Sequence, residues 1–343
     1  MTQHIRLSIC IATYNRSAYI METLDSIIGQ LGPEDELVVV DGASTDETSQ
    51  VVEAVQARCP SVRYYREIDN SGVDRDYDKA VSYARGEYIW LMTDDDLLVQ
   101  NAIHSVTREI EQTQDELIIV NAEVRTADLA SVLCRRMLNF DNDREYSQNN
   151  GAELFMDTAN RLTFIGGLIM KRDLWLSRDR ISYYGSLFIH VGIVFQAPIA
   201  KARVLAEPLV QIRYGVAMWT PRSFEIWMYK WPCLIWSFAN YDAKAKRRIT
   251  AREPWRNPMT LFHYRSKGAY GFGEYARFLS GSRNLAYRLS ALVISVFPTS
   301  FANLLSLVYV SSKRKGNLIP VYDLVNSRRP GAIKRALVWL YRV

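Results

Sequence analysis

Short apolar runs alternate with amphipathic segments over the first 100 residues. The runs at 7–12, 36–40, Val62–Arg66 and Tyr88–Met92 are rich in β-branched and aromatic side chains, which is typical of buried strands. Segments with apolar residues at helical spacing lie between them, at 19–30, 47–57 and 74–84. Strands that alternate with helices predict βαβ units. We therefore expect an α/β fold with a mostly parallel, Rossmann-like sheet and flanking helices.

The middle of the chain is less regular. A helix at 101–112 and a strand at 116–124 continue the pattern, whereas 125–148 is polar, charged and poorly periodic and is expected to form a mobile loop. The apolar stretch 162–171 predicts a strand, and its Gly166 and Gly167 are typical of a site that a ligand or another backbone approaches closely.

A helix at 193–202 and a strand at 203–209 are expected next, followed by a polar–aromatic loop at 211–219. In this loop Arg213 can bind phosphate, and Tyr214 and Trp219 can stack on sugar faces. The alternative role of all three is packing between two parts of the protein.

Polar residues follow three of the predicted strands, and the carboxyl ends of parallel strands meet at one rim where ligands bind. These are the turn 13–16, Asp41, and the three consecutive acids Asp94, Asp95 and Asp96. Adjacent carboxylates at the end of a buried strand need a compensating positive charge, and a Mg²⁺ or Mn²⁺ ion supplies one while leaving positions for substrate phosphates. The alternative is a solvated acidic turn that caps the next helix.

The rim contains neither GxGxxG nor GxxxxGK[ST], so no dinucleotide fingerprint or P-loop explains it. A nucleotide can bind by another route. Asp41 can accept hydrogen bonds from a base edge, Tyr14 can lie against a base or ribose, and Arg75 or Lys79 can neutralise a diphosphate. The structural alternatives are a turn residue before Gly42 and a solvated helix face. Ser44 or Asp46 is expected to cap the helix at 47–57.

Charge changes the picture for the second half of the chain. The 343 residues carry a net charge of +5, but only Glu253, Glu274 and Asp323 are acidic beyond Asp242. This asymmetry predicts an anionic partner, either membrane lipid or nucleic acid. The four cysteines show no CxxC spacing, so we expect reduced structural thiols, and the polar start of the chain predicts no signal peptide.

The stretch 291–310 has no charged residue and approaches the ~20 apolar residues of a membrane span. Pro298 and several serines favour a pair of interfacial helices instead, and 328–343 adds a basic segment with an apolar stripe. We expect a protein bound to the surface of an anionic membrane. The alternative is an ordinary helical bundle, and apolar residues among the basic ones argue against a nucleic-acid partner.

Four motifs in order, ATYNR, VVDGASTDET, NSGVDRDYDKAVSYARGEY and WLMTDDDLL, carry a family resemblance over about the first 100 residues. They are similar to the donor half of family 2 glycosyltransferases with the GT-A fold, and their spacing most resembles O-antigen sugar transferases of the abequosyltransferase type. The resemblance implies a nucleotide-sugar donor, a Mg²⁺ or Mn²⁺ ion, and inversion at the anomeric carbon.

The resemblance also implies roles for residues at matching positions. Asp95 would be the principal metal ligand, supported by Asp94 and Asp96. His190 would occupy the place of the family's acidic general base, with Asp173 and Asp179 as the nearest acidic substitutes. The donor would be bound by Ala12, Tyr14, Arg16, Asp41, Arg75, Asp78, Lys79 and Asp94, and the acceptor by Gly166, Gly167, Arg213 and Trp219.

Three positions depart from the family pattern. Thr93 stands where the acidic motif commonly begins, Gly42 where a second Asp follows the first, and Tyr77 where an Arg is usual, with Arg75 nearby. Asp41 would then contact the base alone.

Together these observations predict a GT-A domain at 1–215 and a helical, basic, membrane-associating region at 216–343. The expected enzyme moves a sugar to a hydroxyl of a saccharide acceptor, carried on polyprenyl diphosphate, at the cytoplasmic face of the bacterial inner membrane. Its rivals are a non-catalytic sugar- or membrane-binding scaffold, a nucleic-acid-binding protein, and a processive or polyol-phosphate transferase. No sequence feature sets an oligomeric state.

Overall fold

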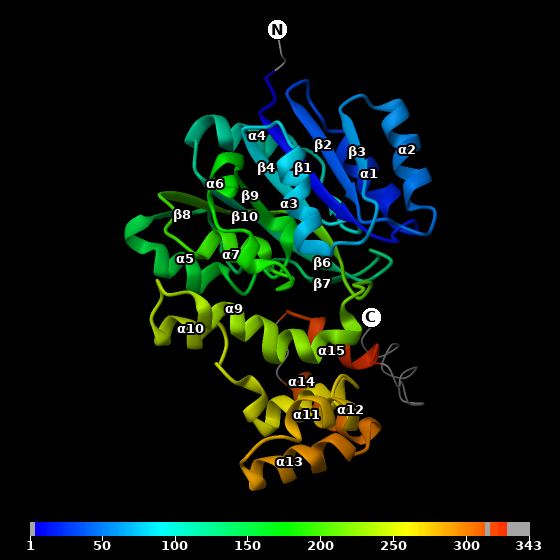
Figure 1. The fold of residues 1–343 in the computed structure, drawn as a ribbon, viewed down its shortest axis with the longest axis vertical. Coiled ribbons are helices and arrows are strands. Elements are labelled where there is room, and N and C mark those ends of the chain that lie inside the picture. The colour runs from blue at the N-terminus through cyan, green and yellow to red at the C-terminus, as the bar shows by residue number, and fades with distance from the viewer. Residues whose placement is uncertain (1–3, 313–315, 328–343) are drawn as a thin grey trace. The chain divides into compact units, whose positions relative to one another are not determined.

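The structure, a computed structural model, describes residues 4–312 and 316–327 in two compact units (Figure 1). The first unit comprises the described residues up to Val124, with Arg135–Arg213 and Phe238–Ala245. The second comprises Arg125–Cys134, Tyr214–Ser237 and the described residues from Lys246 onward.

A mixed sheet forms the centre of the first unit. Its strand order is β3-β2-β1-β4-β9-β6-β10-β5, with β8 paired to β10. The first four strands along the chain are parallel, and β9 joins the sheet antiparallel to β4 and β6. The strands are β1 (Leu7–Thr13), β2 (Asp35–Asp41), β3 (Val62–Arg66), β4 (Tyr88–Met92), β5 (Leu97–Leu98), β6 (Leu117–Arg125), β8 (Arg144–Ser147), β9 (Leu168–Lys171) and β10 (Lys201–Arg213).

The βαβ prediction is confirmed. Every residue of β1, β2 and β4 is buried, as expected for apolar strands covered on both faces. The helices that follow the strands pack apolar stripes against this sheet, and their bounds differ from the predicted ones by one or two residues. They are α1 (Ile20–Ile28), α2 (Thr48–Arg58), α3 (Val73–Tyr83) and α4 (Ala102–Thr113).

The region 125–210 differs more from expectation. The stretch 125–148, predicted as a loop, contains two short strands, β7 (Val132–Cys134) and β8. The predicted strand at 162–171 begins only at Leu168, because Ile165–Gly167 forms a 3₁₀ turn whose Gly166 carbonyl accepts a hydrogen bond from the Trp90 indole, at 2.9 Å. The later helix α7 (Ile189–Phe195) starts before the predicted 193, and β10 extends to Arg213.

Two further helices, α5 (Gly151–Thr158) and α6 (Arg172–Ser177), complete the first unit.

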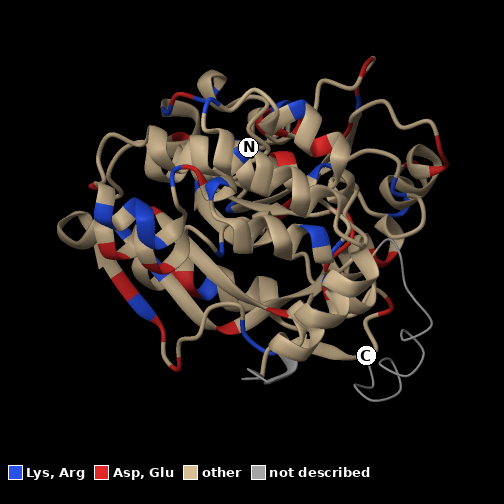
Figure 2. Ribbon diagram, turned by 90° about the horizontal axis from the view of Figure 1, so that it is seen from below, with Lys and Arg blue, Asp and Glu red and all other residues tan. Residues whose placement is uncertain are grey.

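Helices make up most of the chain after Arg213. In the second unit Phe224, Met228, Leu261 and Tyr270 form an aromatic-rich core. The helices in chain order are α8 (Ser223–Glu225), α9 (Trp231–Ser237), α10 (Ala243–Ile249), α11 (Pro258–Ser266), α12 (Phe272–Glu274), α13 (Leu285–Val296), α14 (Thr299–Ser312) and α15 (Ile319–Val325). Acidic and basic residues are spread over the described ribbon (Figure 2).

The apolar stretch before residue 310 is bent. No single helix in the described chain is long and apolar enough to cross a membrane, whereas α13 and α14 pass that test together, with a 96° bend between them. The break falls at Pro298, as the helix-pair prediction requires, because proline cannot continue the hydrogen-bond ladder of the preceding helix. The predicted stripe at 328–343 lies outside the described residues.

Candidate active site

Two arginines compensate part of the negative charge of the acidic loop after β4. Arg16 donates from Nε to Asp94, at 3.0 Å, and also pairs with the Asp95 carboxylate. Arg213, at the end of β10, donates its backbone N–H to the Asp96 carboxylate at 2.6 Å and its Nε to the Asp95 carbonyl at 3.0 Å. The sequence predicted that a positive charge compensates these carboxylates. The two arginines of the chain itself supply part of that charge.

Both arginines lie over the aromatic ring of Tyr19. The guanidinium carbons of Arg16 and Arg213 lie 5.0 and 5.3 Å from its ring centroid, within the range of cation–π attraction. Arg213 also pairs with Glu22, on α1. Segments far apart in sequence are thus tied together around the acidic loop.

The acidic loop remains electrostatically strained despite these pairs. Burial, together with the Asp95 charge and against the attraction of Arg16, raises the pKa of Asp94 to about 6. Burial likewise raises the pKa values of Asp95 and Asp96. Burial makes these carboxylates costly to ionise, and a bound cation would offset that cost. Among the described residues, no three His, Cys, Asp or Glu side chains are placed to hold one metal ion.

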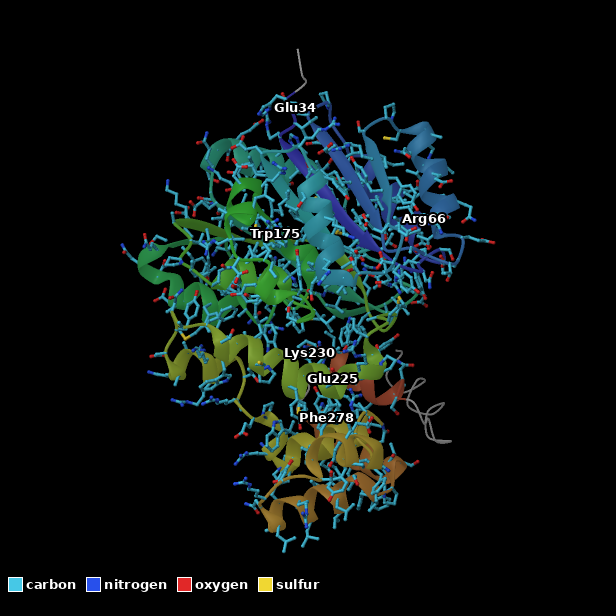
Figure 3. The ribbon with its side chains drawn as sticks, viewed as in Figure 1. Glu34, Arg66, Trp175, Glu225, Lys230 and Phe278 are labelled. Atoms are coloured by element: carbon cyan, nitrogen blue, oxygen red, sulfur yellow. The ribbon has the colours of Figure 1, made fainter. Side chains whose placement is uncertain are left out.

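Asp41 holds the loop after β2. Its side chain is fully buried, and its oxygens accept hydrogen bonds from the Ser44 amide at 2.8 Å and the Tyr64 hydroxyl at 2.7 Å. Arg66, labelled in Figure 3, donates to the Ser44 carbonyl at 2.8 Å. Asp41 thus stabilises the rim from within the unit.

The turn after β1 is fixed against the same loop. Asn15 has a φ of 53°, and its side-chain oxygen accepts from the Thr45 amide at 2.7 Å. The Arg16 amide donates to the Thr48 hydroxyl at 2.8 Å. Tyr14 is half-buried beside Asn15, and the preceding strand residue Ala12 is buried. These contacts hold the Arg16 backbone in place.

The N-cap of α2 is Glu47, whose side chain makes no capping hydrogen bond, and the predicted cap Asp46 lies one residue earlier. The Asp46 carboxylate accepts from the Thr48 amide at 3.0 Å and from Ser17. Burial alone would raise the pKa of Asp46, but hydrogen bonds from Thr48 and Ser17 outweigh it and lower the pKa to about 2. Ser44 instead interacts with Asp41 and Asn15.

The predicted donor residues of α3 contact other parts of the first unit. Asp78 accepts from the Trp175 indole at 2.9 Å, from Arg180 at 3.1 Å and from the Tyr184 hydroxyl; Trp175 is labelled beside α3 in Figure 3. These contacts tie α3 to the segment after β9.

Two basic residues of α3 also have partners. Lys79 pairs with Glu67 at 2.6 Å, and exposed Arg75 lies over the Tyr184 ring, 5.0 Å from its centroid. Their role at the donor diphosphate stays a prediction.

His190 lies inside α7 and is 2% exposed. Its Nε2 lies 2.5 Å from the Leu162 carbonyl, which can only accept, so Nε2 carries the proton. Its Nδ1 is buried and has no hydrogen-bond partner in the described structure. Burial lowers the pKa of His190 to about 4, so the ring is neutral near pH 7. The exposed acid Asp179 caps a nearby turn by accepting from Ser182. The catalytic role of His190 stays a prediction.

The buried His190 gives the protein a specific pH dependence. Between the unfolded pKa of 6.5 and the folded value of about 4, the unfolded chain binds a proton that the folded chain does not. The contribution of His190 to the free energy of unfolding is therefore complete above pH 6.5. It decreases as pH falls, by about 3 kcal/mol at pH 4. Urea unfolding of wild type and His190→Gln at pH 7 and pH 4 should reveal this difference, with exposed His104→Gln as the control. An identical pH dependence in all three proteins would contradict the prediction.

The predicted acceptor residues lie in different surroundings. Gly167 is close to the chain's own backbone, since a Cβ there would lie 3.1 Å from the Val120 carbonyl oxygen. A Cβ at Gly166 would meet the Phe164 ring at 2.5 Å. Trp219, in the second unit, is 46% exposed and packs edge-to-face on Trp227. The close approach indicated by the two glycines is thus explained within the chain.

With this geometry established, comparison with known proteins identifies the family. The sequence profile described as "Glycosyl transferase family 2" matches residues 8–175. Residues 8–175 of this chain belong to the family 2 glycosyltransferases. The match covers the strands that form the rim and the acidic loop.

Curated relatives support the same assignment. Abequosyltransferase RfbV of Salmonella typhimurium is 28% identical over 221 residues, which cover 60% of this chain and 66% of RfbV. Glycosyltransferase GlyG of Streptococcus pneumoniae is 25% identical over 34% of this chain and 38% of GlyG. The matched region thus spans less than two thirds of the length of either relative.

Solved structures establish the GT-A fold of this glycosyltransferase. S. aureus TarS 1–349 in complex with UDP has a TM-score of 0.56 at 17% identity, covering 98% of this chain and 91% of TarS 1–349. Mannosyltransferase PcManGT from Pyrobaculum calidifontis, in complex with GDP-Man and Mn²⁺, has a TM-score of 0.52 at 16% identity and covers 99% of this chain and 88% of its own. The predicted fold class is confirmed.

Sequence reasoning missed two buried acids of this glycosyltransferase, Asp74 and Asp76 on α3. Asp74 accepts from the Leu187 and Ile189 amides at 2.9 and 3.1 Å, and Asp76 lies beside Gly42 after β2. Their only sequence signal is acidity in the first turn of a helix, which is commonplace. Their partners are distant in sequence and emerge only from the fold.

Proposed function

We propose that this glycosyltransferase moves a sugar from a nucleoside-diphosphate donor to a hydroxyl of a lipid-linked saccharide acceptor, with inversion, in the synthesis of a bacterial surface polysaccharide. The observation that carries the proposal is the acidic loop 94–96 at the carboxyl end of β4, on the same rim as the loops after β1 and β2. Similarity to an abequosyltransferase supports the transfer of a sugar, and similarity to a UDP-bound structure supports the donor class.

The acidic loop fits a divalent cation. The Asp94 and Asp95 side chains are 16% and 13% exposed, and their ligating atoms are hard oxygens. Mg²⁺ commonly takes one or two carboxylates and completes its shell with water and substrate phosphates, so a cage of three protein ligands is not required. In the proposal Asp95 is the principal ligand of Mg²⁺ or Mn²⁺, supported by Asp94 and Asp96, and the ion would stabilise the leaving diphosphate.

A thermal-shift panel tests the donor and the ion together. UDP, GDP, CDP and dTDP are each added with Mn²⁺ or with EDTA. We expect one diphosphate to raise the melting temperature of the wild type with Mn²⁺ only, and Asp95→Ala to abolish that shift. Exposed Asp25→Ala should retain it. A flat panel for the folded wild type would contradict the proposal and favour a non-catalytic scaffold.

The second unit supports attachment to the cytoplasmic face of the bacterial inner membrane, which is part of the proposal. Large apolar side chains remain exposed along one stripe of α13, at Leu285, Leu289, Val293 and Val296. A second set is exposed on α14, at Phe301, Leu304, Leu305, Val308 and Tyr309. Helices with exposed apolar stripes bind the interface of a bilayer, and nearby basic residues such as Arg277 and Arg283 favour anionic lipid.

Vesicle co-sedimentation tests this attachment. Leu289→Glu/Val293→Glu should reduce binding to vesicles containing phosphatidylglycerol by at least about tenfold, because charge replaces apolar area that would enter the interface. Both positions are more than half exposed, at 52% and 62%, so the fold should persist. Ala251→Glu/Ala276→Glu, which adds equal charge at exposed positions outside α13 and α14, should bind as wild type does. Equal binding by all three proteins would contradict the assignment.

A further inference from the structure

A side chain at Gly42 would require the Asp76 carboxylate to move. A Cβ at this position would lie 2.7 Å from Oδ2 of Asp76, a distance that real Cβ atoms do not adopt. The φ of Gly42 is not in the left-handed region, so conformational freedom is not the reason for glycine here. The Asp76 carboxylate therefore occupies the space that a side chain after Asp41 would take.

Asp76 is almost completely buried but only partly satisfied. The residue is 3% exposed, and its Oδ1 accepts from the Ser71 hydroxyl at 2.8 Å. The Lys79 ammonium lies 3.9 Å from the same oxygen. Within the described chain, Oδ2 has no hydrogen-bond partner. An ionised carboxylate oxygen that accepts no hydrogen bond within the protein is available to accept one from a ligand.

The position of Asp76 places that oxygen on the rim. It belongs to the first turns of α3, which packs over β1 and β2 (Figure 1). The Gly42 amide beneath it donates to the Thr13 carbonyl at the end of β1, at 2.9 Å, and the Tyr77 hydroxyl donates to the Met92 carbonyl at the end of β4, at 2.9 Å. The start of α3 thus bridges the carboxyl ends of β1, β2 and β4, where the strand order changes direction and ligands bind in such sheets.

Asp41 is less suited to contact a ligand directly. It is fully buried, and each of its oxygens already accepts a hydrogen bond from Ser44 or Tyr64. Asp76 Oδ2, which lies beside Gly42 after β2, accepts no hydrogen bond within the described chain.

We infer that Asp76 recognises the nucleoside of the donor, its Oδ2 accepting a hydrogen bond from an N–H of the base or a hydroxyl of the ribose. An ionised carboxylate only accepts hydrogen bonds, and both groups are donors. The inference rests on the proposed function and moves nucleoside recognition from Asp41 to a residue of α3. Gly42 is then glycine because the recognising carboxylate reaches the rim from another element.

Calorimetric titration with Mn²⁺ present tests the inference. The probes are UDP, GDP, CDP and dTDP, with inorganic pyrophosphate as a diphosphate that lacks a nucleoside. Asp76→Ala should weaken binding of the preferred nucleoside diphosphate about 10- to 100-fold, as expected for loss of a hydrogen bond to a charged group. Binding of pyrophosphate should not change. Exposed Asp69→Ala is the matched control and should bind every probe as wild type does.

A relocation variant separates recognition from folding. In Gly42→Asp/Asp76→Ala the carboxylate returns to the same space from the β2 loop, so binding should recover to within about threefold of wild type. Comparing the preferred diphosphate with its 2′-deoxy form (its ribo form for dTDP), in wild type and Asp76→Ala, then distinguishes a ribose hydroxyl from a base N–H.

The outcomes separate the two proposals. If wild type binds pyrophosphate but discriminates no nucleoside, or if Asp76→Ala binds the preferred nucleotide as tightly as wild type, the inference is overturned and the proposed function stands. If wild type binds no nucleoside diphosphate, both are overturned. Asp76→Ala could also lose pyrophosphate binding, with no recovery in the relocation variant. That result would mean that Asp76 only supports the fold, and it would overturn the inference.

Discussion

Replacing Arg16 with methionine is expected to lower the free energy of unfolding of the first unit by about 3–5 kcal/mol in EDTA. The Arg16 side chain is 7% exposed and pairs with two carboxylates that are themselves largely buried. Methionine keeps much of the apolar stem but leaves Asp94 and Asp95 beside each other without their nearest cation. Removal of one partner from a buried pair is costly because the other charge stays buried and uncompensated.

Divalent metal should reverse part of this loss. If Asp94 and Asp95 are metal ligands, Arg16 and the ion share the same oxygens, and the variant should gain more stability from Mn²⁺ than wild type does. Urea unfolding in EDTA and in Mn²⁺ measures both effects. Arg58→Met removes an exposed pair with Asp25, with side chains 53% and 52% exposed, and should cost at most about 1 kcal/mol in either condition. An equal Mn²⁺ effect in wild type and Arg16→Met would remove the acidic loop from consideration as the ion site.

The parallel half of the fold could be predicted because local pattern and tertiary environment agree there. The fully buried strands β1, β2 and β4 are each centred on a mostly apolar run in the sequence, and α1 carries a clear apolar stripe. The region after β6 could not be predicted in the same way. The strand β8 has one buried residue in four and is defined by pairing with β10, about 60 residues away, which no local pattern records.

The candidate site likewise has a part that the sequence predicts and a part that it does not. Motif order placed the acidic loop and Asp41 on one rim, since that placement follows from strand polarity alone. The partners of those residues do not follow from it, because Arg213 reaches Asp95 and Asp96 from the far end of β10, and Asp76 reaches Gly42 from α3. The sequence predicted a metal ion as the positive charge beside the acidic loop. In the structure arginines supply part of that positive charge, and their positions depend on the whole sheet.

Asp74→Ala is expected to destabilise the first unit by about 2–4 kcal/mol, because it leaves one buried and one partly buried backbone amide without their acceptor. Asp74 is 4% exposed, and its two oxygens accept from the Leu187 and Ile189 amides at 2.9 and 3.1 Å. Asp74→Asn retains one amide oxygen and should lose about half as much. Exposed Asp69→Ala, from the loop before α3, should change the free energy of unfolding by less than about 0.5 kcal/mol.

The backbone near Asp74 explains why this contact matters beyond its own free energy. Leu187 has a φ of 72°, a left-handed conformation that a leucine adopts only under constraint, at a cost of about 1–3 kcal/mol. The Asp74 carboxylate holds the amides of Leu187 and Ile189 together and so fixes the entry into α7, the helix that carries His190. Leu187→Gly should therefore recover part of the stability lost in Asp74→Ala, as measured by urea unfolding of the single and double variants. If the losses in free energy of unfolding of the two single variants add up in the double variant, contacts other than Asp74 hold Leu187 in its left-handed conformation.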